Sequence, residues 1–182
     1  GGTDNNGDQD VFIRDRIQNT TIRVSSDSSG NAGNAPSPQG HISADGSTIV
    51  LTTNASSISS SPNNDQQLVM INRATNQRQR ISAPRNLPDD YTGCGGSTLS
   101  ADGRYIGFIC FAPMLENSYN TDGVASTPIG DTSQVYRYDQ LTGNLRIVDF
   151  HDDGTLPNSV NDHSLASVNI SSDGQRMTYY DL

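Results

Sequence analysis

The chain lacks lysine and tryptophan, and only one of its acidic residues, Glu116, is a glutamate. Without lysine, catalysis through a Schiff base or a lysine general base is excluded. The 11 cationic residues are all arginines and are outnumbered by 20 acidic residues, which gives a net charge of −9. This charge argues against nucleic acid as a partner, because such proteins carry a basic surface. No apolar run approaches the roughly 20 residues of a membrane-spanning helix, so no membrane span is expected.

Apolar residues are also scarce, at 32% of the 182 residues. With so few, a core requires thin strands, and we expect one face of most strands to meet water. Asp, Asn, Ser, Thr and Gly are abundant instead, and their side chains favour turns and strands over helices because they compete for backbone hydrogen bonds. No segment shows a convincing helical period. The composition therefore predicts an all-β protein.

A Ser-x-Asp-Gly turn occurs three times, at residues 43–46, 100–103 and 171–174, each time before an apolar or alternating run. An Asp-Gly pair between two such runs is typical of a β-hairpin, because glycine supplies the positive φ that the turn requires. A second hairpin also occurs three times. Its copies span residues 11–25, 68–82 and 135–150.

Both hairpins repeat with a variable period of about 60 residues, and four antiparallel strands per repeat of this size describe a propeller blade. The sequence thus predicts an all-β, β-propeller fold of about three blade equivalents. Strands 3–4 of a split blade are expected in 1–35, full blades in 36–92 and 93–160, and strands 1–2 of a split blade in 161–182. Because propellers close with four to eight blades, the chain is expected to be part of a longer protein or to associate with other copies.

These hairpins and the Asp-x-Asn-Gly-x-x-Asp-Val-Phe loop at residues 4–12 resemble TolB-type β-propeller repeats of the secreted bacterial kind. The resemblance covers essentially the whole chain and implies the propeller fold. It implies little about function, because such propellers serve as binding platforms and as domains of unrelated enzymes. Residues 61–67 and 128–134, the corresponding segments of the other repeats, depart from the Asp-rich loop.

The Asp-rich loop offers side-chain oxygens at every second residue, on a chain made flexible by Gly7. They belong to Asp4, Asn6, Asp8 and Asp10. Hard oxygen ligands at this spacing suit Ca²⁺, although the bidentate glutamate of an EF-hand is missing. The alternative is a solvated acidic turn in which Asp10 caps local backbone amides.

Cys94 and Cys110 bracket the second Ser-x-Asp-Gly turn at positions that face each other across the hairpin. Directly opposed residues lie close enough for a disulfide after modest adjustment, and two buried thiols are the alternative. A disulfide and a composition rich in Ser, Thr and Asn indicate a secreted or extracellular protein, at the cell surface or in the periplasm.

Catalytic signatures are missing. His41, His151 and His163 show no metal-ligand spacing, and the chain has no Gly-x-Ser-x-Gly motif. The sequence therefore predicts no catalytic residues and a chain that is not an enzyme.

The function expected is that of a non-catalytic extracellular structural or interaction protein, a subunit of a ring or filament that forms when chains complete each other's split blades. One alternative is a fragment of a longer secreted propeller that binds a glycan or peptide ligand. A less favoured alternative is the propeller part of a lyase or peptidase.

Overall fold

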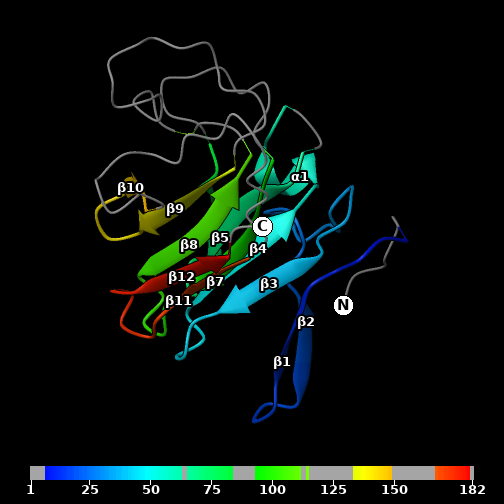
Figure 1. The fold of residues 1–182 in the computed structure, drawn as a ribbon. Coiled ribbons are helices and arrows are strands. Elements are labelled where there is room, and N and C mark those ends of the chain that lie inside the picture. The colour runs from blue at the N-terminus through cyan, green and yellow to red at the C-terminus, as the bar shows by residue number, and fades with distance from the viewer. Residues whose placement is uncertain are drawn as a thin grey trace, which may run out of the picture.

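The computed structural model describes residues 7–62, 65–83, 93–111, 114, 133–148 and 167–180. These residues form twelve strands and one short helix, α1 (Ser56–Ser59), as Figure 1 shows. The strands in chain order are β1 (Phe12–Asp15), β2 (Thr20–Arg23), β3 (Gln39–Ile42), β4 (Thr48–Thr53), β5 (Gln67–Asn72), β6 (Arg78–Arg80), β7 (Cys94–Leu99), β8 (Tyr105–Cys110), β9 (Gln134–Asp139), β10 (Asn144–Ile147), β11 (Ser167–Ile170) and β12 (Met177–Tyr180). No helix within the described ranges has the length and apolarity that a membrane crossing requires.

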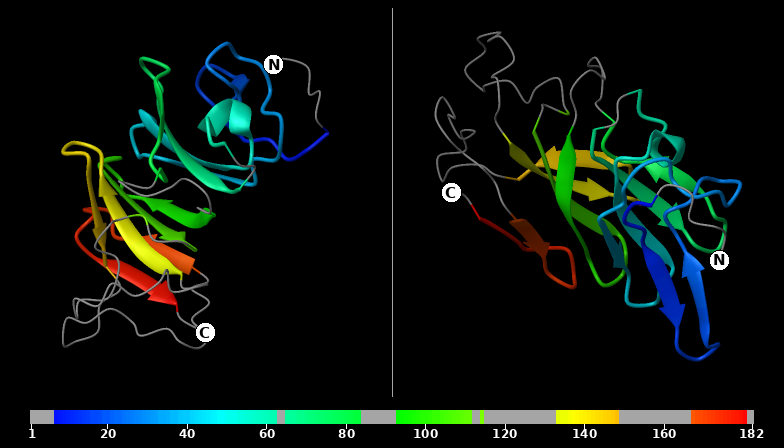
Figure 2. Two further views of the ribbon diagram at one scale, coloured as in Figure 1. Left: turned by 90° about the horizontal axis from the view of Figure 1, so that it is seen from above. Right: turned by 90° about the vertical axis from the view of Figure 1, so that its right-hand side faces the viewer.

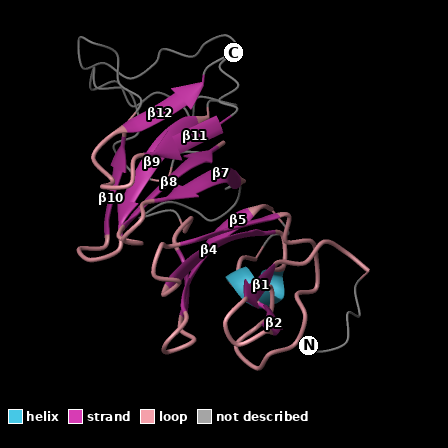
Figure 3. Cartoon of the chain, turned by 90° about the horizontal axis from the view of Figure 1, so that it is seen from below, coloured by secondary structure: helices cyan, strands magenta, loops and turns pink. Residues whose placement is uncertain are grey.

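The strands form four separate sheets, and within each sheet the strands that are consecutive in the chain pair antiparallel (Figure 3). The first full blade has the order β3-β4-β5-β6, and the second full blade has the order β10-β9-β8-β7. The hairpin β1-β2 precedes them and the hairpin β11-β12 follows; we call these the N-terminal and C-terminal half-blades. A four-stranded antiparallel meander is the blade of a β-propeller. The predicted fold class is therefore confirmed: half a blade, two blades and half a blade.

The middle strands of the full blades are buried on both faces. All six residues of β4 and all six of β8 are buried, so these two strands are exceptions to the expectation that one face of most strands meets water. The reason is that each full blade is covered on both sides by a neighbouring sheet. Successive side chains of a strand point to opposite faces, so alternate residues of β4 and β8 enter different cores.

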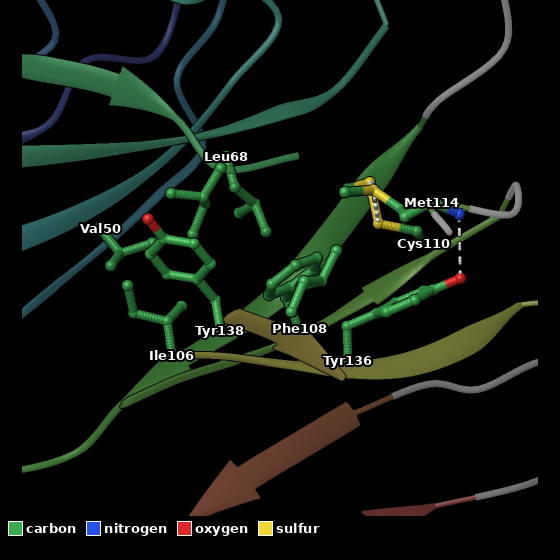
Figure 4. Close-up of a cluster of buried hydrophobic side chains, with 11 residues drawn as sticks. Val50, Leu68, Ile106, Phe108, Cys110, Met114, Tyr136 and Tyr138 are labelled. Atoms are coloured by element: carbon green, nitrogen blue, oxygen red, sulfur yellow. Dashed lines mark hydrogen bonds between the residues drawn. A yellow bond between two sulfur atoms is a disulfide. The ribbon is translucent and has the colours of Figure 1, made fainter. Parts of the chain in front are cut away.

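The core between the two full blades joins residues that lie far apart in the sequence. Val50 and Leu68 of the first blade pack with Ile106, Phe108 and other residues of the second blade (Figure 4). The cluster also contains Ile81, Cys94, Cys110, Met114, Tyr136, Tyr138 and Leu145. This apolar contact fixes the two blades face to face.

The half-blades cover the outer faces of the two full blades. Val11, Ile13 and Val24 of the N-terminal half-blade pack against a cluster of the first blade that includes Ile49. Val168 and Met177 of the C-terminal half-blade pack against Ile109 and Val135 of the second blade. The two half-blades lie at opposite ends of this row of sheets (Figure 2). Among the described residues, no further sheet covers the far side of either half-blade.

The three Ser-x-Asp-Gly turns join β3 to β4, β7 to β8 and β11 to β12. In each turn the serine Oγ donates to the aspartate Oδ1, at 2.5–2.6 Å. The glycine N–H donates to the serine carbonyl at 2.9 Å, and the glycines have φ of +73°, +76° and +69°. These positive values explain why glycine ends each turn. The turns predicted from the sequence are thus present and alike.

The helix α1, one turn long, has no counterpart in the sequence analysis. It lies between β4 and β5, where Ala55 and Ile58 are buried against the first blade. Ser60 ends it with a left-handed φ of 56°. A single turn is too short to display a helical period, which explains why the sequence pattern did not reveal it.

Replacement of Gly174 by alanine tests how tightly the C-terminal half-blade sits on the second blade. A Cβ atom there would overlap the Tyr105 ring, whereas one at Gly143 would meet no atom within 4 Å. Both glycines have a φ near +70°, so the variants share the cost of a left-handed alanine, about 1 kcal/mol. We expect Gly174→Ala to lower the unfolding free energy by roughly 1–3 kcal/mol more than Gly143→Ala in urea titrations. Equal losses would show that Tyr105 is not held there.

Candidate assembly interface

Each half-blade leaves unpaired, among the described residues, a strand edge that is paired in the full blades. In the full blades the second strand pairs with the third, β4 with β5 and β8 with β9. The C-terminal half-blade ends with a second strand, β12, and the N-terminal half-blade begins with a third strand, β1. Within the described residues, β12 pairs only with β11, and β1 pairs only with β2. An unpaired strand edge is a template for another strand.

The turn that follows each third strand defines which residues of the blades correspond. Asp15 Oδ1 accepts hydrogen bonds from the Ile17 and Gln18 amides, both at 2.8 Å. Asn72 and Asp139 accept equivalent bonds at the ends of β5 and β9. Counted back from these caps, Phe12 of β1 corresponds to Tyr136 of β9. Counted forward from the turn serines, Tyr179 of β12 corresponds to Phe108 of β8.

Phe108 and Tyr136 show what a completed blade does with these positions. They lie directly opposite each other in the β8-β9 register, and their rings stack with centroids 5.8 Å apart. Both are 0% exposed, whereas Phe12 is 54% exposed and Tyr179 is 41% exposed. The two half-blades therefore expose the aromatic pair that the complete blade buries.

The two half-blade edges also carry charged residues at corresponding positions. Tyr105 lies opposite Asp139 in the second full blade, and the corresponding residues of the half-blades are Arg176 and Asp15. These two carry opposite charges. Opposite charges on directly opposed residues of antiparallel strands are favourable. The two edges are complementary in aromatic character and in charge.

The contact between the second blade and the C-terminal half-blade centres on Tyr105. The guanidinium groups of Arg104 and Arg137 each lie 4.8 Å from the centre of its ring. Arg137 Nη1 also donates to the Gly174 carbonyl at 3.1 Å, across to the half-blade. Arg104 forms a two-pronged pair with Asp139, at 3.0 and 2.9 Å. This hydrogen bond from Arg104 lowers the pKa of Asp139 from its ordinary 3.8 to about 2.

Of the four predicted calcium ligands, Asp4 and Asn6 lie outside the described residues. Asp8 is exposed. Asp10 is engaged within the half-blade: its Oδ1 accepts from Ser25 Oγ at 2.6 Å, and its Oδ2 lies 3.3 Å from Arg23 Nη1. Calcium binding by this loop stays a prediction.

Cys94 and Cys110 are paired in the β7-β8 register and are joined by a disulfide. Both are buried beside Met114, whose sulfur lies 3.2 Å from that of Cys110. The bridge ties β7 to β8 at the end of this hairpin opposite the Ser-x-Asp-Gly turn. Of the three histidines, His41 lies half-buried in β3, where burial lowers its pKa. His151 and His163 lie outside the described residues.

A polar groove of about 620 Å³ lies between the two full blades, with Arg78, Gln79, Arg104 and Gln140 among its lining residues. Arg104 is paired with Asp139, as described. Arg78 donates to the Val24 carbonyl at 3.2 Å and therefore links the first blade to the N-terminal half-blade. Both arginines of this groove are thus engaged in contacts within the protein, and we assign the groove no ligand.

No protein-family model and no curated protein match this chain. Among solved structures it is similar to TolB from Acinetobacter baumannii, at 17% identity and a TM-score of 0.48, over 93% of this chain and 31% of that protein. Kuenenia stuttgartiensis hydrazine synthase is 17% identical with a TM-score of 0.46, over 94% and 43% of the two chains. Oligogalacturonate lyase from Vibrio parahaemolyticus is 16% identical with a TM-score of 0.42, over 78% and 33%. The chain spans less than half the length of each of these proteins.

Acid titration tests the Arg104–Asp139 pair. Because the pKa of Asp139 is lower in the folded protein than its ordinary 3.8, its contribution to stability is present above about pH 4 and is lost as the pH falls toward 2. Asp139→Asn should keep the turn cap, as Asn72 does, but lose the charge. We expect a shallower fall in unfolding free energy between pH 4 and pH 2, measured by urea titration at each pH. Arg104→Gln should also give a shallower slope, because the largest cause of the lowered pKa of Asp139 is lost, and an unchanged slope in both variants would contradict the assignment.

Proposed function

We propose that this chain is a non-catalytic β-propeller subunit that assembles head to tail, each copy completing a blade with the next. One observation carries the proposal. Phe12 and Tyr179 are exposed on the two half-blades, at the positions where the full blade stacks and buries Tyr136 and Phe108. The occupant that fits each edge is the other half-blade of a second copy.

In this assembly β12 of one copy pairs antiparallel with β1 of the next. The register of the full blades then places Tyr179 opposite Phe12, Thr178 opposite Ile13 and Arg176 opposite Asp15. The joined blade has the strand order β11-β12-β1-β2. This order reproduces that of a full blade, with each strand paired to the next.

The packing of β1 within its own chain is consistent with this arrangement. Val11 and Ile13 contact the core of the first full blade. Phe12 lies between them in the strand, so its side chain points to the opposite face. That face would meet the second full blade of the other copy, as Tyr136 of the second blade meets the first. Both faces of the joined blade would then be covered.

A contact of this kind is head-to-tail, because the two edges that meet are different surfaces. Such contacts generate closed rings when the rotation closes, and filaments when it does not. Two copies of about three blade equivalents would close a six-bladed ring, within the usual range of propellers. The disulfide fits a secreted protein in the periplasm or outside the cell, and we include this location in the proposal.

A non-catalytic role is supported by how the turn hydroxyls are used. Ser43 Oγ donates to Asp45 and accepts the Thr48 amide at 3.0 Å. Ser100 and Ser171 make the same two bonds in their turns. In all three turns the serine and the aspartate are engaged with each other and with the turn backbone, so these pairs shape the turns.

Substitution of Phe12 tests the interface. Phe12→Asp would place a carboxylate in the aromatic contact between copies, where it has no partner. We expect the dissociation constant of the assembly to rise at least about hundredfold, corresponding to the roughly 3 kcal/mol of a lost buried phenylalanine. Light scattering after size-exclusion chromatography, over a range of concentrations, would measure it.

Ile17→Asp is the matched control for Phe12→Asp. Ile17 lies on the same hairpin and is 97% exposed, but it is in the turn and outside the proposed contact. We expect this variant to assemble as the unaltered chain does. A chain that stays monomeric at every concentration would refute the proposal and favour completion of the edges by other blades of a longer protein.

Cross-linking tests the register. When a chain carrying Ile13→Cys is mixed with one carrying Thr178→Cys and oxidised, we expect disulfide-linked dimers on a non-reducing gel, because opposed cysteines of paired strands come within bridging distance. Neither variant should cross-link alone. Arg14→Cys mixed with Thr178→Cys is the control, since a shift of one residue places the thiols on opposite faces. Equal cross-linking in the control would contradict the register.

A further inference from the structure

Backbone hydrogen bonds connect the three Ser-x-Asp-Gly turns to one another. Ala44, the second residue of the first turn, donates its amide to the carbonyl of Ala101 in the second turn, at 2.8 Å. Ala101 in turn donates to the carbonyl of Ser172 in the third turn, at 3.0 Å. Ala101, in the middle turn, is therefore both donor and acceptor, whereas Ala44 only donates and Ser172 only accepts. The bonds form a row that crosses from blade to blade.

The other amides of each turn are used by hydrogen bonds within the turn, which leaves the amide of the second residue for this row. In the third turn the Gly174 amide donates to the Ser171 carbonyl at 2.9 Å, and the Gln175 amide donates to Asp173 Oδ1 at 3.0 Å. The Arg176 amide donates to Ser171 Oγ at 2.9 Å. The amide of the second residue points outside the turn, as the bonds from Ala44 and Ala101 show.

The row of hydrogen bonds between turns ends at the first turn and at the third turn. Among the described residues, the Ser172 amide has no acceptor and the Ala44 carbonyl has no donor, and both residues are exposed. The two end groups have opposite character, one donor and one acceptor. In the assembly proposed above, the blade that follows the Ser172 turn is the first full blade of the next copy, which carries the Ala44 turn.

We infer that the Ser172 amide of one copy donates to the Ala44 carbonyl of the next, so that the row of turn hydrogen bonds continues across the joint between chains. This inference rests on the proposed function. It adds a second contact, between the β11-β12 turn of one copy and the β3-β4 turn of the next, to the β12-β1 pairing. The small second residues of the turns, Ala44, Ala101 and Ser172, permit the close approach of the backbones.

Ser172→Pro tests this bond. Proline lacks the amide hydrogen and is favoured at the second position of a turn with the i to i+3 hydrogen bond seen here, so the substitution removes the donor and keeps the turn. We expect the unfolding midpoint of the monomer to be unchanged or slightly raised. We expect the dissociation constant of the assembly to rise about tenfold, the effect of one lost hydrogen bond. Concentration-dependent light scattering and thermal unfolding of the dilute monomer measure the two quantities.

Two further variants separate the donor from other effects of the substitution. Ser172→Ala keeps the amide and should assemble with the affinity of the unaltered chain. Ala101→Pro removes an amide whose bond lies within the chain, and it should lower the unfolding midpoint of the monomer. This contrast shows that proline is costly where the amide is used internally.

The outcomes distinguish the two proposals. If the unaltered chain assembles and Ser172→Pro assembles equally well, the turn bond between copies is refuted while the proposed function stands. If Ser172→Pro lowers monomer stability as much as Ala101→Pro does, the Ser172 amide is used within the chain and the inference is again refuted. If the unaltered chain never assembles, both proposals fail.

Discussion

The structure depends on the burial of each blade between two neighbours. The middle strands β4 and β8 bury every residue, and this is possible only because another sheet covers each of their faces. A sheet with two apolar faces cannot end a row without exposing apolar surface to water. This constraint explains both the separate cores between the sheets and the exposure of Phe12, which lies on the face of β1 opposite Val11 and Ile13.

The contacts between blades are of two kinds, one that varies from one pair of blades to the next and one that recurs in each pair. The variable part is side-chain packing: Val50 and Leu68 meet Phe108 in one core, while the Tyr105 ring between two arginines meets Gly174 in another. The constant part is backbone hydrogen bonding between turns of the same shape. Backbone groups do not change when side chains diverge, so a hydrogen-bonded row of turns is compatible with blades whose cores differ.

Much of the local structure could be predicted from short sequence patterns. The hairpins at all three Ser-x-Asp-Gly motifs, and the facing positions of Cys94 and Cys110, follow from turn chemistry and from counting residues across a turn. The helix α1 could not be predicted, since one turn has no period. The strands β4 and β8 are exceptions to the expected exposure of one face of most strands, because composition does not say which strands are covered twice.

The amino-acid sequence determines the repeats, the strand order and the division into two half-blades, because these depend on turn residues and alternation over a few neighbours. The engagement of Asp10 by Ser25 and Arg23, the stacking of Phe108 on Tyr136 and the hydrogen bonds between turns are decided by the tertiary structure. They join residues of different strands or blades, and their distances depend on how whole sheets pack. For the same reason only the folded blades show which side chains at the open edges correspond to buried ones.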